Sequence, residues 1–161
     1  MKTIVVLVLL CWMFIATGCG SSKPSTEQAS GVAGGVWNSK FGLIKLIDFR
    51  KVNAEAKEIQ GQKVYVYDFI SAWELPDGLA WRDSGGEPGF WKDFGPGDRN
   101  NFLGHFVPLP KGTTAVRRGT ITFRYTENGW VSGKVPDNWT DNYCTDLKPD
   151  ACYTKVGWDK N

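Results

Sequence analysis

Few side chains in this sequence have the types and spacing that catalysis or metal binding requires. His105 is the only histidine, and catalytic zinc is held by several His, Cys or carboxylate ligands, so a zinc enzyme is not expected. Asp137-Asn138 and Asp141-Asn142 offer oxygen ligands for calcium, but no spacing of the EF-hand type surrounds them. We therefore expect no metal and no cofactor, and a His105 that is a loop residue satisfied by hydrogen bonds.

Four acidic residues near aromatic residues are the other candidates for catalysis. A pair of such carboxylates could hydrolyse glycosides, although acids in a loop are usually solvated. The chain holds no Gly-x-Ser-x-Gly, no P-loop and no Gly-x-Gly-x-x-Gly motif. We expect a protein that is not an enzyme, with an unrecognised envelope hydrolase as an alternative. The four acids are Glu74, Asp77, Asp83 and Glu87.

Asp83-Ser84-Gly85-Gly86 resembles the nucleophile segment of chymotrypsin-like proteases, in which the Ser attacks and the Gly backbone forms an oxyanion hole. That family has its His upstream of the Ser, whereas His105 lies downstream. The segment is expected to be a glycine-rich turn.

Cys144 and Cys152 enclose seven residues. An exported chain meets an oxidising compartment, so we expect a disulfide between them, with a metal pair or two free thiols as the alternative.

Residues 76–112 form a connection far longer than the usual four to six residues, with eight glycines and five prolines. Its six aromatic residues argue against disorder. It is expected either to fold back as a lid or to expose rings that stack on sugars or anchor a protein partner. Trp81, Trp91 and Phe94 flank its Gly-rich turns and are the predicted binding contacts.

Four segments carry the patterns of β-strands. Residues 43–50 and 63–75 suit a long hairpin, and the second is apolar on both faces, as in an interior strand. Residues 119–126 alternate, with Ile121, Phe123 and Tyr125 facing inward. Asn128-Gly129 predicts a type I′ turn into a return strand at Trp130.

One helix is expected before these strands. Residues 32–41 have apolar residues at helical spacing, but Gly34-Gly35 weakens the pattern, so a short or broken helix is predicted. We expect an α+β domain in which a curved antiparallel sheet of about four strands has its concave face covered by that helix or by a loop, with an all-β sheet as the alternative.

Composition limits the partners. The net charge of +2 over 161 residues is too small to attract nucleic acid or anionic lipid by bulk field, so no nucleic acid partner is expected. Fourteen per cent aromatic residues and 19 glycines suggest a loop-rich β protein.

The N-terminus has the layout of a secretory leader: a basic start, an apolar run too short to span a bilayer, and small residues before Cys19. Residues 16–22 resemble the lipobox of bacterial lipoproteins, which implies a diacylglyceryl group on the Cys19 thiol and a membrane partner. The alternative is an ordinary leader. An Asp at position 20 would resemble an inner-membrane retention signal. The residue there is Gly20, which favours the outer membrane if the host has one.

Four regions follow from these patterns. They are a signal peptide (1–18), a flexible tether (19–31) without large apolar residues, a globular α+β domain (32–135), and an irregular tail pinned by the disulfide (136–161).

Residues 111–123 and 126–130, paired with the Tyr-rich strand 63–75, resemble the closing hairpin of small uncharacterised bacterial envelope proteins. That resemblance implies no activity. The expected function is that of a non-enzymatic, lipid-anchored cell-envelope protein that binds a ligand or an envelope protein. A glycan- or peptidoglycan-binding module is the alternative.

Overall fold

The computed structural model describes residues 23–42, 44–92, 105–146 and 148–158, in which strands are the dominant element. Its elements are α2 (Thr26–Phe41), β1 (Lys45–Ile59), β2 (Gln62–Glu74), β3 (Leu79–Ser84), β4 (Gly89–Lys92), β5 (His105–Pro108), β6 (Thr114–Thr126), β7 (Gly129–Val131), β8 (Asn138–Cys144) and α3 (Pro149–Lys155). A sheet-rich chain is thereby confirmed. In the described residues, no helix has the length and apolar character needed to cross a membrane.

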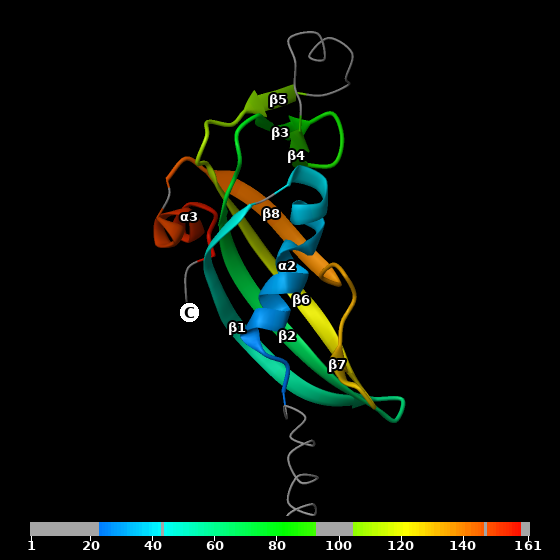
Figure 1. The fold of residues 1–161 in the computed structure, drawn as a ribbon. Helices are drawn as coiled ribbons and strands as arrows, with labels where there is room; N and C mark the ends of the chain where they lie inside the picture. The colour runs from blue at the N-terminus through cyan, green and yellow to red at the C-terminus, as the bar shows by residue number, and fades with distance from the viewer. Residues whose placement is uncertain (1–22, 43, 93–104, 147, 159–161) are drawn as a thin grey trace, which may run out of the picture.

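The strands form two antiparallel sheets. The larger has the order β1-β2-β6-β7, and β8 also pairs with β6; the smaller has the order β4-β3-β5. The larger sheet curves around α2, and the smaller sheet lies beyond the end of α2 at the top of the view (Figure 1). All four strands expected from the sequence belong to the larger sheet, and β2 lies between β1 and β6 as its two apolar faces predict.

Helix α2 is longer and begins earlier than the sequence pattern indicated. Ser25 caps it: the Ser25 Oγ accepts from the Gln28 backbone N–H at 3.1 Å, and the Gln28 Oε1 accepts from the Ser25 N–H at 2.9 Å. Ala29 and Ala33 are fully buried against the sheet. Residues 26–31, which were expected to belong to the tether, are therefore part of this helix, because small residues fit a close helix–sheet contact that larger ones would prevent.

The two glycines expected to break α2 instead allow it to approach its neighbours closely. A Cβ at Gly34 would lie 2.6 Å from the Trp73 ring, and one at Gly35 would lie 2.7 Å from the Lys134 carbonyl oxygen. Since real Cβ atoms do not approach so closely, these positions exclude other residues. The helix is unbroken because tertiary packing outweighs the low helix propensity of glycine.

The main core lies between α2 and the larger sheet. Trp37 and Phe41 from the helix meet β2 and β6 side chains such as Tyr67, Phe69 and Phe123. A second, smaller core on the other face of the sheet contains Ile70, Val116, the two cysteines and Tyr153. The larger sheet is thus covered on both faces, and α3 covers the second.

The turns differ from the sequence prediction. Gln60 and Gly61, between β1 and β2, have φ angles of 52° and 77°, as a type I′ hairpin turn requires. At the β6–β7 turn Gly129 has a φ of 97°, whereas Asn128 is not in the left-handed region, so the predicted type I′ turn is wrong there. Ile121 and Phe123 face inward as expected, but Tyr125 is 43% exposed because β6 continues beyond the core.

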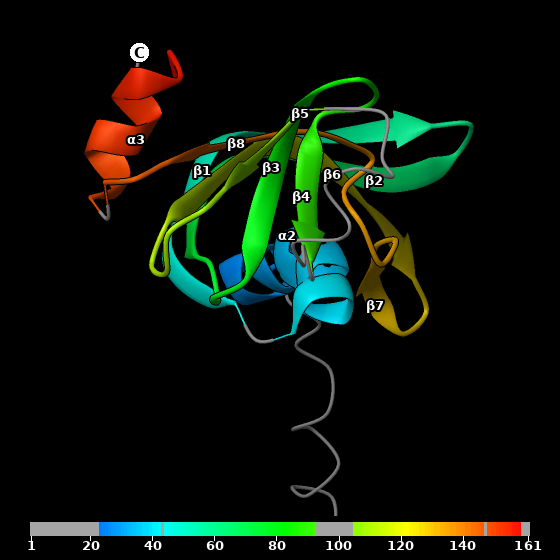
Figure 2. The same cartoon turned by 90° about the horizontal axis from the view of Figure 1, so that it is seen from above.

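The long connection between β2 and β6 contains the smaller sheet. Its residues 93–104 lie outside the described part. Phe90 is 3% exposed and joins the main core. This segment therefore forms a layer over one end of α2 (Figure 2).

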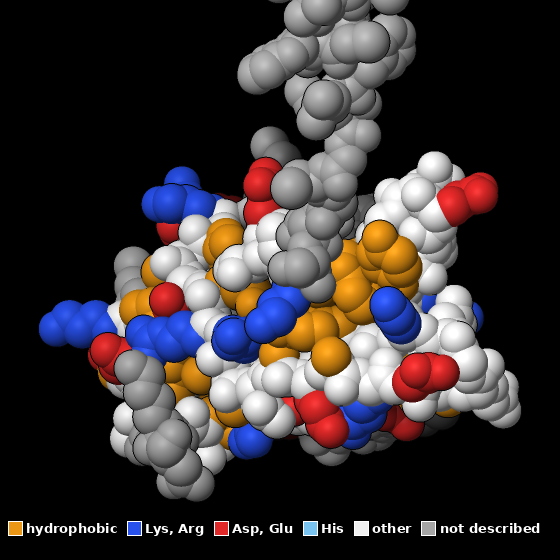
Figure 3. Space-filling view, turned by 90° about the horizontal axis from the view of Figure 1, so that it is seen from below, with side chains coloured by type: hydrophobic (Ala, Val, Ile, Leu, Met, Phe, Trp, Pro, Cys, Tyr) orange, Lys and Arg blue, Asp and Glu red, His pale blue; other side chains and the backbone are white. Residues whose placement is uncertain are grey.

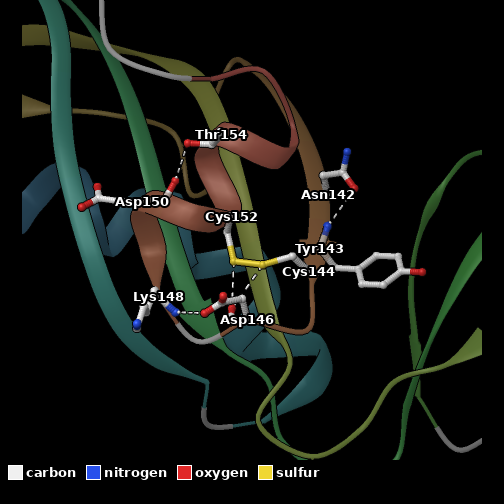
Figure 4. Close-up of a disulfide and its surroundings, with 8 residues drawn as sticks. All are labelled: Asn142, Tyr143, Cys144, Asp146, Lys148, Asp150, Cys152 and Thr154. Atoms are coloured by element: carbon white, nitrogen blue, oxygen red, sulfur yellow. Dashed lines mark hydrogen bonds between the residues drawn. A yellow bond between two sulfur atoms is a disulfide. The ribbon is translucent and has the colours of Figure 1, made fainter.

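The C-terminal region is more regular than predicted. Strand β8 pairs with β6 from Asn138 to Cys144, and α3 follows, so the expectation of an irregular tail is wrong. The disulfide between Cys144 and Cys152 is confirmed, with a Cα–Cα distance of 5.7 Å (Figure 4). It fastens α3 to the end of β8, outside the curve that holds α2 (Figure 2).

Candidate functional site

The two predicted binding contacts that the structure describes differ in how far they are buried. Trp81 is 8% exposed, with its ring centroid 4.8 Å from that of Phe90 and 5.4 Å from that of Tyr143. Its ring does not point outward, because β3 turns it onto the main core. Trp91 is half-buried at the surface, and Phe94 lies outside the described residues. Binding by these three residues stays a prediction.

Trp91 belongs to an aromatic cleft of about 250 Å³ between the smaller sheet, α2 and β8. The Arg82 guanidinium carbon lies 4.6 Å from the centroid of the Trp91 ring. The Arg82 Nε and Nη2 also donate to the Glu87 carbonyl oxygen at 2.8 and 2.5 Å. The cleft thus combines flat rings with a fixed cation. It is lined by Val36, Trp37, Phe41, Arg82, Glu87, Pro88, Gly89, Phe90, Trp91, Trp139 and Asp141.

A larger and more apolar concavity, which we call the α2–β7 groove, runs along the other side of α2. Its volume is about 690 Å³, within the range of about 300–1,000 Å³ that is usual for small-molecule sites. One of its lining residues, Lys134, carries a charge. The groove is lined by Gln28, Gly31, Val32, Gly35, Val36, Ser39, Phe123, Trp130, Val131, Ser132, Lys134 and Val135.

The sequence creates the groove by alternating small and β-branched residues on one face of α2. A Cβ added at Gly31 would meet no atom within 4 Å, so the helix surface there is open. Phe123, at 1% exposure, belongs to the core beneath it. Trp130 follows the β6–β7 turn and contributes another wall. No local sequence pattern indicates this groove, because its lining residues come from a helix and a hairpin that lie almost 100 residues apart in the chain.

A buried ion pair fixes α2 on the sheet. The Arg117 side chain is fully buried, and its Nε and Nη2 donate to Asp141 Oδ1 and Oδ2 at 2.7 and 2.9 Å. Its Nη1 donates to the Ala33 carbonyl oxygen of α2. The guanidinium carbon also lies 3.9 Å from the centroid of the Trp37 ring, whose Nε1 donates to Asp141 at 3.2 Å. Every face of this cation is occupied by protein, so it positions the helix and offers nothing to a ligand.

Three of the four acids considered for catalysis make local structural contacts, and in one of these Asp77 Oδ1 accepts from the Gly78 backbone N–H at 3.1 Å. His105 is the first residue of β5, not the loop residue that was expected. Its Nδ1 lies 2.8 Å from Asp83 Oδ1, so the expected hydrogen bond is present. Glu74 pairs with Lys45 at 3.3 Å. Gly85, with a φ of 80°, lies in the glycine-rich turn that joins β3 to β4.

Asp137 and Asp141, considered for calcium, have other partners. Asp137 Oδ2 accepts from the Thr122 N–H at 2.5 Å, and Asp141 holds Arg117. Within residues 23–42, 44–92, 105–146 and 148–158, no three His, Cys, Asp or Glu side chains are grouped so as to hold a metal ion.

Among the residues that the structure describes, Tyr153 has the one strongly perturbed pKa, and it lies far from both concavities. The Tyr153 hydroxyl of α3 donates to Asp48 Oδ2 at 3.2 Å. Burial, followed by the negative charge of Asp48, holds the pKa of Tyr153 well above its usual value. Arg50 pairs with Asp48 at 2.5 Å and with Asp150 at 2.8 Å. This cluster attaches α3 to β1, and no concavity opens onto it among those described.

Comparison of the chain with protein families, with curated proteins and with solved structures finds no match in any of the three.

Proposed function

We propose that this chain is a lipid-anchored protein of the cell envelope that binds a ligand or a protein partner without catalysing a reaction. The observation that carries the binding role is the α2–β7 groove, an open and largely apolar concavity with a few polar residues in its lining. The lipobox-like segment before Cys19 supports the anchor and the envelope location.

The finer fold class belongs to the same proposal. We assign the chain to the α+β class as a single domain, because α2 packs on one face of an antiparallel sheet instead of alternating with parallel strands. Gly20 in place of Asp supports the outer membrane as its location in a host that has one.

The anchor is tested at Cys19. In the native host, wild-type protein is expected to incorporate labelled palmitate, and Cys19→Ala to incorporate none and to keep its leader, because the thiol is the acyl acceptor. Gel mobility and autoradiography measure both. Cys11→Ala is the matched control, since that thiol lies within the leader, and it should label like wild type. Absence of label from the wild-type protein would rule out the anchor.

Glycan binding is a second candidate, and the aromatic cleft favours it. Trp91 presents part of its ring at the surface while Arg82 packs on it, an arrangement that suits stacking on a sugar face beside a charged or hydroxyl group. The flat ring and the fixed guanidinium would supply contact area and hydrogen bonds together.

Trp91→Ala is expected to weaken binding to isolated peptidoglycan by about 1–3 kcal/mol, because a stacking ring is lost. Sedimentation of protein with peptidoglycan measures this. Trp158→Ala, which removes a half-buried Trp beside the second core, should bind as wild type. Equal binding by the Trp91 variant and the wild type would rule out glycan binding in this cleft.

A further inference from the structure

The α2–β7 groove has the length of a single lipid chain. Its helical wall runs from Gln28 to Ser39, and the eleven helical steps between these two residues span roughly 16 Å. The hydrocarbon core of a bilayer is about 30 Å thick, so the chains of one leaflet extend about 15 Å. Chain and groove therefore match in length.

The lining of the groove matches such a chain in chemistry. Eight of the twelve lining residues are glycine or apolar, and the other four are Gln28, Ser39, Ser132 and Lys134. None of the described residues that line it is acidic. Among the described residues, no carboxylate forms a salt bridge with Lys134. The groove thus offers an apolar channel beside a cation that can pair with an anionic lipid headgroup.

The position of the groove favours a membrane as the source of the ligand. Cys19 precedes Lys23 by four residues, so covalent geometry keeps their Cα atoms within about 14 Å of each other. The helix that lines the groove begins three residues later, at Thr26. Seen from the end of the molecule where α2 begins, hydrophobic side chains gather in a patch beside Lys and Arg side chains (Figure 3).

We propose that the α2–β7 groove binds one long-chain fatty acid taken from the membrane that holds the protein, with its chain along α2 and its carboxylate paired with Lys134. The choice of a membrane source rests on the proposed anchor at Cys19. The groove itself does not depend on it. Occupation by the protein's own acyl chain, or by a peptide, is a different outcome of the test below.

Calorimetric titration with palmitate, below its aggregation concentration, tests the groove. The protein is the full mature chain, residues 19–161, with Cys19→Ser so that it has no acyl chain of its own. Saturable one-to-one binding is expected. Gly31→Leu should weaken it at least tenfold, because the new side chain fills the open surface at Gly31. The unfolding temperature of that variant should not fall, because leucine is the better helix former.

The charge is tested separately. Lys134→Glu should weaken palmitate binding about five- to tenfold, whereas Lys155→Glu, the same change at an exposed residue of α3, should bind as wild type. Methyl palmitate, which lacks the negative charge, should bind the wild type and the Lys134→Glu variant equally. No saturable palmitate binding, or unchanged binding by Gly31→Leu, would overturn the proposal.

The source is tested with the acylated wild-type protein in lipid nanodiscs that contain deuterated palmitic acid. Recovery of deuterated palmitate with the purified protein, and its loss in Gly31→Leu, supports the membrane source. Binding by the Cys19→Ser chain but not by the acylated protein would instead assign the groove to the protein's own acyl chain, which overturns the membrane source. If the labelling test at Cys19 fails, the proposed anchor is wrong. Palmitate binding by the groove is then decided by the calorimetric titration alone.

Discussion

Replacing Arg117 by methionine is expected to lower the free energy of unfolding by about 3–5 kcal/mol, because it leaves a mostly buried carboxylate without its cation. The Asp141 side chain is 14% exposed and loses both of its guanidinium bonds. The Ala33 carbonyl oxygen also loses a donor. Chemical denaturation followed by circular dichroism measures the change.

Arg118→Met is the matched control, since Arg118 is the next residue of β6 and is exposed. It should change stability by no more than about 0.5 kcal/mol. The double variant Arg117→Met with Asp141→Leu should recover much of the loss, because it removes both buried charges together. If the single Arg117 variant is as stable as the Arg118 variant, the pair does not fix α2 as argued.

The alternation of side chains along β6 also predicts an inward-facing Arg117. Ile121 and Phe123 were expected to face inward, and both are 1% exposed. Because side chains alternate along a strand, continuing this pattern backwards by pairs of residues places Arg117 on the same face. Its partner Asp141 lies on β8, a strand that no local pattern predicted, so the pair itself could not be foreseen.

Helix α2 shows why periodicity alone was insufficient. Its buried face contains Ala29, Ala33 and Gly34 as well as Trp37, and small residues contribute little to an apolar pattern. The usable signal was the Ser25-x-x-Gln28 spacing, which is a capping box. The strands were easier to predict, because β2 and β6 are rich in branched and aromatic residues that must be buried.

The candidate site was less predictable than the fold. Trp91 was identified from composition and does line a cleft. The α2–β7 groove arises where glycines of a helix meet a hairpin distant in sequence, and neither segment alone indicates a concavity. Gly31 helps to form the groove because it has no side chain, so it cannot be predicted from residue types that make binding contacts.

Trp37→Ala is expected to lower the free energy of unfolding by about 3–5 kcal/mol, because it opens a cavity where three layers meet. Trp37 is 2% exposed, and its ring centroid lies 5.8 Å from that of Trp73 in the larger sheet. It also lies 5.6 Å from that of Phe90 in the smaller sheet. Thermal and urea denaturation of the purified chain measure the loss.

Two further variants separate packing from hydrogen bonding at this position. Trp37→Phe keeps a ring in the core but loses the Nε1 bond to Asp141, so it should cost less than the alanine variant. Trp139→Ala removes a ring that is 39% exposed and also faces the Arg117 guanidinium, at 5.5 Å. It should cost about 1 kcal/mol, near the centre of measured single substitutions. A loss at Trp139 equal to that at Trp37 would show that contact with Arg117, rather than burial between the two sheets, sets the stability of this junction.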